Sequence, residues 1–401
     1  MVFSKHKPRN FKQRRTDAFN KCLLLFKDES LIFAICIFFI SSPFFTWDNK
    51  ITLISTICCY FLLIKNMSIR RNELVFFIIF FLLFTYVSIR AQSAFFKFLV
   101  IIGITLLLIT SKKFILKSFN YYRFIFSITI VPSIIVFFLV YFDVMNLNYN
   151  IIDGVGLKEY TYSQYPFLLV PTGKISDIII PRFHGYYDEP GVVGTISGVL
   201  LLSDKFNLKK LINIPIFISG IISFSLAFYF ISFVYFIWIF LNSGLKWKAV
   251  ILIISLIVIP LLVKDTNVNK HIIDRFSSEP KNIINMRTSD SFDLWFENFL
   301  KTPDVFLGLG GKTSQELINI GGSSYKDLIV NYGIIFFLLF SLSVFLYSLK
   351  KIKNFQGVII YFLIFILIIY QRPYITSFFY MFLLFSPLEH LRNLNNSKII
   401  K

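Results

Sequence analysis

Four titratable side chains lie close together in the segment 181–194, PRFHGYYDEPGVVG: Arg182, His184, Asp188 and Glu189. An imidazole or a carboxylate can take a proton from a hydroxyl group as a general base. A guanidinium group can bind a phosphate through two parallel N–H donors. These residue types therefore indicate a site that activates a hydroxyl nucleophile beside an anionic group.

The same segment predicts the start of a helix. Pro190 precedes an apolar run with glycine at positions 191, 194 and 198, and proline is favoured in the first turn of a helix. Asp188 or Glu189 would lie near the N-cap, so capping is an alternative role for Asp188. Glu189 could instead orient Arg182. The positive end of such a helix, with its free N–H groups, favours an anionic ligand.

A second polar segment, 285–314, reads NMRTSDSFDLWFENFLKTPDVFLGLGGKTS. Aromatic side chains recur in it at helical spacing, which predicts an amphipathic helix over 290–300 at a membrane surface. Its aromatic stripe, which includes Trp295, is expected to pack against membrane or core in preference to a sugar. Arg287 precedes this helix much as Arg182 precedes the first one. Alone it would be a solvated charge, but two such arginines favour a shared anionic ligand.

Several other kinds of site are excluded. The segment GLGGKTS at 308–314 is not a phosphate-binding loop, because that pattern requires glycine where this chain has Phe306. His184 and His271, the only histidines in the two long outer loops, are too few and too separated to indicate a zinc site, and each could be a surface residue. No Asp-x-Asp pair lies near these motifs. We therefore expect neither a metal nor a cofactor.

The composition indicates which elements must position these residues. Of the 401 residues, 56% are hydrophobic and 51 are phenylalanine, which is too apolar for a soluble domain. Runs long enough to cross a hydrocarbon core predict an all-α polytopic integral membrane protein with about twelve spans. The predicted spans are 30–46, 51–65, 74–90, 94–110, 120–142, 190–203, 210–223, 226–242, 247–263, 327–349, 357–371 and 373–388.

Basic residues give these spans an orientation. Lysine and arginine concentrate in alternate short loops, which places both termini in the cytoplasm by the positive-inside rule. The net charge of +19 then mainly reflects topology. A nucleic-acid partner is excluded, because the charges are scattered between spans and do not form one basic face.

Two loops are too long to be simple connectors, 143–189 and 264–326, and both are predicted to face outward. We expect one membrane domain over 31–388 between cytoplasmic tails at 1–30 and 389–401. The basic N-terminal tail lacks a cleavage site and is expected to stay on the protein. All four cysteines precede both loops, so no disulfide is expected in either.

Three motifs in this order carry a resemblance to a known family. They are Arg182-x-x-Gly185-x-x-x-Glu189-Pro190 before a span, Arg287 and Trp295 before FLGLG, and SSYKDLIVNYGIIFFLLF at 323–340. The chain resembles the Wzy-type O-antigen and capsular polysaccharide polymerases of the O-antigen ligase and polymerase superfamily. The resemblance implies a GT-C-like membrane glycosyltransferase at the outer face of the bacterial cytoplasmic (inner) membrane.

The implied reaction moves a growing glycan from undecaprenyl diphosphate to a new lipid-linked repeat unit. The substrates are thus an undecaprenyl-diphosphate-linked donor and acceptor among membrane lipids, and a chain-length co-polymerase is an expected partner. Because the leaving group is a diphosphate, cations are required where charge develops. The expected catalytic residues are Glu189 first, then His184 and Asp188, and the expected substrate or diphosphate contacts are Arg182, Arg287, Arg372 and Trp295.

There are three alternatives to this function. An O-antigen ligase would transfer the same donor to lipid A core, but ligases usually carry a histidine before the tenth span, where this chain has GGSSYKD. The chain also departs from the polymerases, because neither Arg182 nor Arg287 is followed by glycine in the Arg-x10-Gly spacing reported for them. A mechanism that relies on two such motifs therefore cannot be carried over to this chain. A flippase would be expected to show related halves and charges inside spans, which we do not find. A purely structural subunit would leave the loop residues unexplained.

Overall fold

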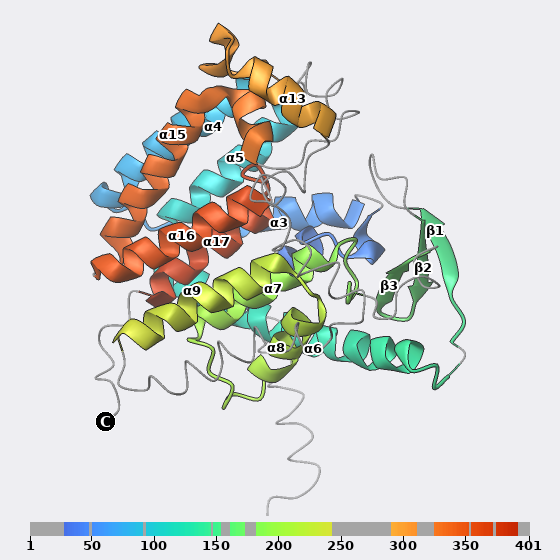
Figure 1. Cartoon of the computed structure of the whole chain (residues 1–401). Helices are drawn as coiled ribbons and strands as arrows, with labels where there is room; N and C mark the ends of the chain where they lie inside the picture. Colours follow the sequence, from blue (N-terminus) through green and yellow to red (C-terminus); the bar gives the residue numbers. More distant parts are fainter. Residues whose placement is uncertain are drawn as a thin grey trace, which may run out of the picture.

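The computed structural model describes residues 28–47, 50–90, 94–145, 147–153, 161–172, 182–242, 290–310, 325–352, 354–371 and 374–391. Within them the chain is mostly helical (Figure 1). The α-helices are α2 (Glu29–Ile40), α3 (Lys50–Lys65), α4 (Arg71–Arg90), α5 (Ala94–Ile109), α6 (Lys112–Tyr141), α7 (Pro190–Ser203), α8 (Asn213–Ile222), α9 (Leu226–Asn242), α13 (Asp290–Phe299), α15 (Tyr325–Lys351), α16 (Phe355–Gln371) and α17 (Phe378–Leu391). Two short 3-10 helices, η1 (Phe44–Thr46) and η3 (Pro303–Val305), complete the helical elements described.

A helix lies at each predicted span within the described residues, and the predicted span 247–263 lies outside them. By length and composition, α4, α6 and α15 could cross a membrane, and the other apolar helices are shorter. A mostly helical, apolar protein is therefore confirmed, whereas twelve membrane crossings stay a prediction. The predicted tails lie almost entirely outside the described residues.

The first helix ends earlier than predicted. Asp28 caps α2 by accepting a hydrogen bond from the Ser30 backbone N–H at 3.1 Å, but α2 stops at Ile40 and not at residue 46. Pro43 explains the difference, because proline disfavours a helical conformation in the residue before it. Ser42 has a positive φ of 61°, and the chain continues as η1.

The all-α prediction was wrong for the loop 143–189. This loop contains a three-stranded antiparallel sheet in the order β1 (Asn150–Asp153), β2 (Thr161–Tyr165) and β3 (Leu168–Pro171). In its register Ile151 pairs with Ser163, and Ser163 pairs with Val170. The strands have only four or five residues each, which is too short for a clear period-two pattern in the sequence.

Helix α7 is the most deeply buried helix described. Every residue from Pro190 to Ser203 is buried, and α7 packs against α8, α9 and α17. The glycines allow this packing. A Cβ at Gly194 would lie 2.2 Å from the Ser225 Cβ, and one at Gly198 would lie 2.9 Å from the Ile231 Cδ1. The start of this helix is therefore fixed in the interior of the bundle.

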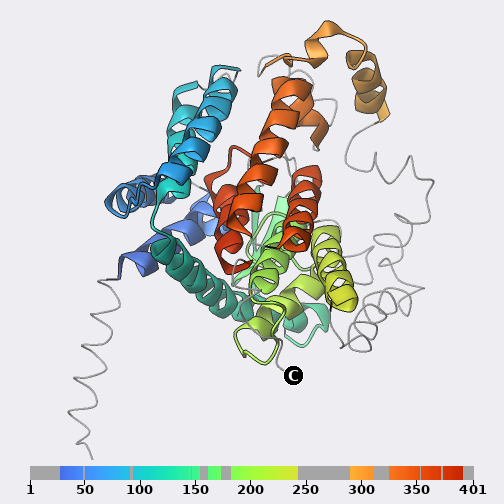
Figure 2. The ribbon, with the colours of Figure 1, turned by 90° about the vertical axis from the view of Figure 1, so that its left-hand side faces the viewer.

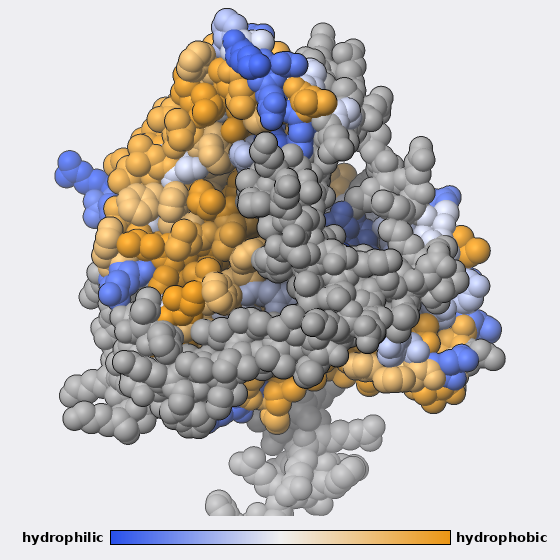
Figure 3. All heavy atoms as spheres, viewed as in Figure 1, coloured by the Kyte–Doolittle hydropathy of each residue, from blue (hydrophilic) through white to orange (hydrophobic). Residues whose placement is uncertain are grey.

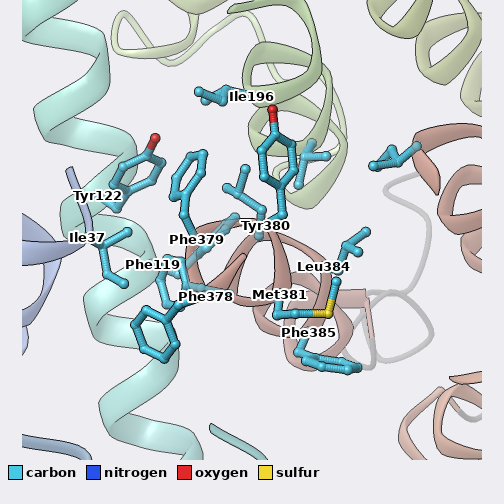
Figure 4. Close-up of a cluster of buried hydrophobic side chains, with 14 of the residues drawn as sticks. Ile37, Phe119, Tyr122, Ile196, Phe378, Phe379, Tyr380, Met381, Leu384 and Phe385 are labelled. Carbon is cyan, nitrogen blue, oxygen red and sulfur yellow. The ribbon is translucent and has the colours of Figure 1, made fainter. Parts of the chain in front are cut away.

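Helix α17 fills the centre of the same core. Figure 4 shows its side chains surrounded by Ile37 of α2, Phe119 and Tyr122 of α6, and Ile196 of α7. The ring of Phe382 on α17 lies 5.7 Å from that of Phe33 on α2, in an edge-to-face arrangement. The first and last helices described are thus packed together.

A smaller, separate core joins α13 to the beginning of α15. It contains Phe292, Phe296, Phe299, Val305, Ile329 and Val330. Figures 1 and 2 both place α13 at the end of the molecule away from α8. Helix α15 is broken at Gly333, where φ is 84° and ψ is 162°, a conformation that only glycine adopts easily. Ile329 and Val330, before the break, belong to this core. Phe340, after it, contacts Phe80 of α4 and Phe365 of α16.

Candidate functional site

The segment 182–189 is held in place by backbone hydrogen bonds to three other elements. The Phe44 N–H of η1 donates to the Tyr186 carbonyl at 2.9 Å, and the Leu169 N–H of β3 donates to the Gly185 carbonyl at 2.8 Å. The Phe183 N–H donates to the Ile222 carbonyl, at the end of α8, at 3.1 Å. Segments distant in sequence therefore fix the backbone that carries the predicted site.

Two tyrosines in the middle of the segment point into the bundle. The Tyr187 hydroxyl shares a hydrogen bond of 2.9 Å with the Ser41 hydroxyl, and the Tyr186 hydroxyl shares one of 2.9 Å with that of Thr129. Both tyrosine side chains are 1% exposed, and burial raises the pKa of each phenol. They therefore remain protonated and anchor the segment, while Asp188 and Glu189 beside them stay partly exposed.

His184 is buried, and its ring is hydrogen-bonded to a backbone carbonyl group. Its Nδ1 lies 3.1 Å from the Asp188 carbonyl oxygen, which also accepts a hydrogen bond of 3.1 Å from the Tyr162 hydroxyl. Because a carbonyl oxygen only accepts, this bond requires the proton on Nδ1. In the neutral imidazole the lone pair then resides on Nε2, which is the arrangement required of a general base.

Glu189 is the N-cap residue of α7, and Pro190 occupies the first helical position, as the sequence predicted. The Glu189 backbone is extended, with φ −135° and ψ 137°, but its side chain makes no capping hydrogen bond. Asp188 precedes the N-cap and binds His184 and Tyr162 through its backbone carbonyl. Simple helix capping therefore does not account for the Glu189 carboxylate.

Arg182 lies against the end of α8. Its Nε donates to the Ser223 carbonyl at 3.3 Å, and its Nη2 donates to the Phe224 carbonyl at 3.2 Å. These carbonyls follow the last turn of α8, where a cation is favourable. The guanidinium group thus links the turn between α8 and α9 to the segment that starts α7, and part of its donor capacity is already used.

Trp295 does not lie at this site. It belongs to the separate core of α13 and α15, where its ring stacks on that of Phe299 at 5.3 Å. Figures 1 and 2 show α13 well above α7. The aromatic stripe of α13 is therefore used for packing, in agreement with the preferred interpretation of the sequence. Arg287 and Arg372 lie outside the described residues.

Sequence reasoning missed the contribution of the sheet. Tyr162 of β2 is 2% exposed, its ring lies 6.4 Å from that of His184, and the Trp47 ring lies 6.1 Å from it on another side. The segment TYSQY at 161–165 has no regular alternation, so the sequence carried no signal for this strand.

Comparisons of the chain with protein-family models, with curated proteins and with solved structures found no match.

Proposed function

We propose that this protein is a membrane glycosyltransferase of the polysaccharide polymerase type. In the proposed reaction, a hydroxyl group of a lipid-linked repeat unit attacks the anomeric carbon of a growing glycan. The glycan leaves undecaprenyl diphosphate, and the protein acts at the outer face of a bacterial cytoplasmic membrane. Both the resemblance of the motifs and the chemistry of residues 182–189 support this proposal.

The observation that carries it is the placement of His184, Asp188 and Glu189 at the start of the buried helix α7. A diphosphate leaving group gains negative charge as its bond to the sugar breaks, and donors aimed at that charge lower the barrier. The first N–H groups of α7 and the Arg182 guanidinium group supply positive potential beside these residues.

The acceptor hydroxyl must lose a proton as it attacks. Glu189 is the first candidate to accept this proton, because the residue is partly exposed and its side chain makes no capping hydrogen bond. His184 is the second candidate, since its Nδ1 hydrogen bond leaves the basic lone pair on Nε2. The base then holds the proton, the new glycosidic bond forms, and undecaprenyl diphosphate departs.

The experiment is a gel analysis of surface glycan length in cells that lack the gene. These cells are complemented at matched protein levels with the wild type, Arg182→Ala, Glu189→Gln or His184→Gln. Glu297→Gln is the control, because Glu297 is an exposed carboxylate on α13. We expect a collapse to single repeat units on the anchor for the site variants and full-length chains for the control.

Other outcomes separate the alternatives. Full-length polymer that accumulates on its lipid carrier would indicate an O-antigen ligase. Repeat units retained on the cytoplasmic side would indicate a flippase. An unchanged ladder in cells that lack the gene would rule out the polymerase proposal.

A further inference from the structure

The short loop 306–310, FLGLG, pairs with the broken part of α15. The Leu309 N–H donates to the Val330 carbonyl at 2.7 Å, and the Gly310 N–H donates to the Asn331 carbonyl at 3.1 Å. In the opposite direction, the Ile335 N–H donates to the Phe306 carbonyl at 3.4 Å. The break at Gly333 interrupts the helical hydrogen bonds of α15, and the loop supplies new partners for the backbone groups on either side of it.

The end of α4 fastens this loop from the other side. The Tyr86 hydroxyl contacts the Leu307 carbonyl at 2.5 Å and the Tyr332 carbonyl at 3.1 Å. Arg90, the last residue of α4, donates from its Nη2 to the Gly308 carbonyl. Among the described residues three helices could cross a membrane, and the 306–310 loop is bonded to two of them, α4 and α15.

These two helices lie side by side and share an exposed apolar face. Phe80 of α4 and Phe340 of α15 are in contact, with ring centroids 6.0 Å apart. Figure 3 shows hydrophobic side chains over this face and hydrophilic ones near α13. The exposed apolar side chains are Leu74, Val75, Ile78, Leu82 and Ile89 on α4, and Ile335, Leu338, Leu339, Leu342, Leu346 and Leu349 on α15.

The loop extends this face at one end. Phe306 and Leu307 are 55% and 58% exposed. The Phe306 carbonyl accepts a hydrogen bond from the N–H of Ile335, the first residue in the stripe of exposed apolar side chains on α15. At about 1.5 Å per residue, the stripe from Ile335 to Leu349 covers about 21 Å. The hydrocarbon core of a bilayer is about 30 Å thick, so the stripe alone is too short to span it.

We propose that Phe306 and Leu307 insert among the acyl chains of the bilayer and complete the apolar surface of α4 and α15. The loop has no charged residue. Its hydrogen bonds with α15 pair the Val330 and Asn331 carbonyls and the Ile335 N–H near the break, which lowers the cost of placing non-helical backbone at membrane depth. Arg90 then lies at the headgroup level, where its apolar stem can remain in the membrane and its charge can reach water. The second outer loop is therefore tethered in the membrane next to α15.

This inference rests on the membrane placement in the proposed function, but not on its chemistry. The test places a single cysteine, labelled with bimane, in a chain whose four native cysteines are replaced by alanine. The positions are Phe306→Cys, Leu82→Cys at the middle of the exposed α4 stripe, and Glu297→Cys on the exposed side of α13. The purified protein is placed in phosphatidylcholine vesicles with or without bromine on the acyl chains.

We expect brominated lipid to quench the label at positions 306 and 82 but not at 297, and aqueous iodide to quench only the label at 297. Iodide quenching at 306 would overturn the inference. Protection at 306 from both quenchers would also overturn it, since protein would then cover the loop. An unquenched label at 82 would reject the membrane placement itself. A second test needs no cysteine replacement. Phe306→Trp is introduced into the native chain, and brominated vesicles should quench more tryptophan fluorescence in this variant than in the wild type.

Discussion

The Lys326 ammonium group lies 2.6 Å from the Asp293 Oδ1, and both side chains are almost fully buried. Lys326 also lies 5.4 Å from the centre of the Phe296 ring. This pair connects the amphipathic helix α13 to the first turn of α15, next to the core that the two helices share. The pair is a structural contact within the loop 264–326, for which the sequence predicted a functional role.

Removing one member of this pair should destabilise the association of α13 with α15. Asp293→Ala leaves the lysine charge buried without this partner, and such a change costs about 3–5 kcal/mol. Limited proteolysis of the purified protein should show faster cleavage near α13. The double variant Asp293→Leu with Lys326→Met should be cleaved more slowly than Asp293→Ala, because no charge is left buried. Equal cleavage of wild type and Asp293→Ala would contradict this role.

Tyr162→Phe should affect the proposed activity through His184. The substitution keeps the ring but removes the hydroxyl that binds the Asp188 carbonyl, a hydrogen bond of roughly 1 kcal/mol, or about fivefold in rate. If His184 is the base, the acidic limb of the pH–rate profile should also shift. Tyr165→Phe is the control, since Tyr165 lies on the opposite face of the sheet from Tyr162. Equal effects of the two changes would argue against a positioning role for Tyr162.

Asp204 should contribute stability that is lost in acid. Burial opposes its ionisation, but hydrogen bonds from Lys210 and Asn213 and the charge of Arg123 outweigh burial, and its pKa lies below the usual value. The pKa of this carboxyl group is lower in the folded protein than in the unfolded chain, where it is about 3.9. Its contribution to the free energy of unfolding is therefore complete above the unfolded pKa and is lost as the pH falls through the folded pKa.

We therefore expect Asp204→Asn to lower the unfolding temperature at pH 7, with a smaller difference from wild type as the pH falls below about 4. Thermal unfolding of both proteins in detergent checks this. A difference that does not change with pH would mean that Asp204 acts through packing and not through its charge.

Gly194→Ala should be more harmful than Gly198→Ala. The new Cβ at 194 would lie 2.2 Å from the Ser225 Cβ, which is close to the backbone and cannot move independently. At 198 the nearest atom, 2.9 Å away, is the end of the flexible Ile231 side chain. Overpacking of this kind costs about 1–3 kcal/mol. Thermal unfolding should show the order, and similar unfolding temperatures for the two variants would contradict it.

The sequence predicted the helices well because their apolar runs are long and end at clear charges or prolines. It also predicted that α7 starts at Pro190, where proline and the preceding acidic residues give a local signal. The sheet was not predicted, because strands as short as Asn150–Asp153 depend on partners elsewhere in the chain. For the same reason the role of Tyr162 was invisible: its contact with Asp188 exists only once the sheet packs on the segment 182–189.

The position of α17 has a consequence for how the protein is made. This helix is the last one described, yet its side chains contact α2, α5, α6 and α7 at the centre of the core. All these helices are synthesised before α17 leaves the ribosome, so their inward faces stay uncovered until α17 packs against them. A nonsense mutation just before α17 would therefore leave α7 without one of its packing partners, and quality-control proteases would meet an open bundle instead of a nearly complete protein.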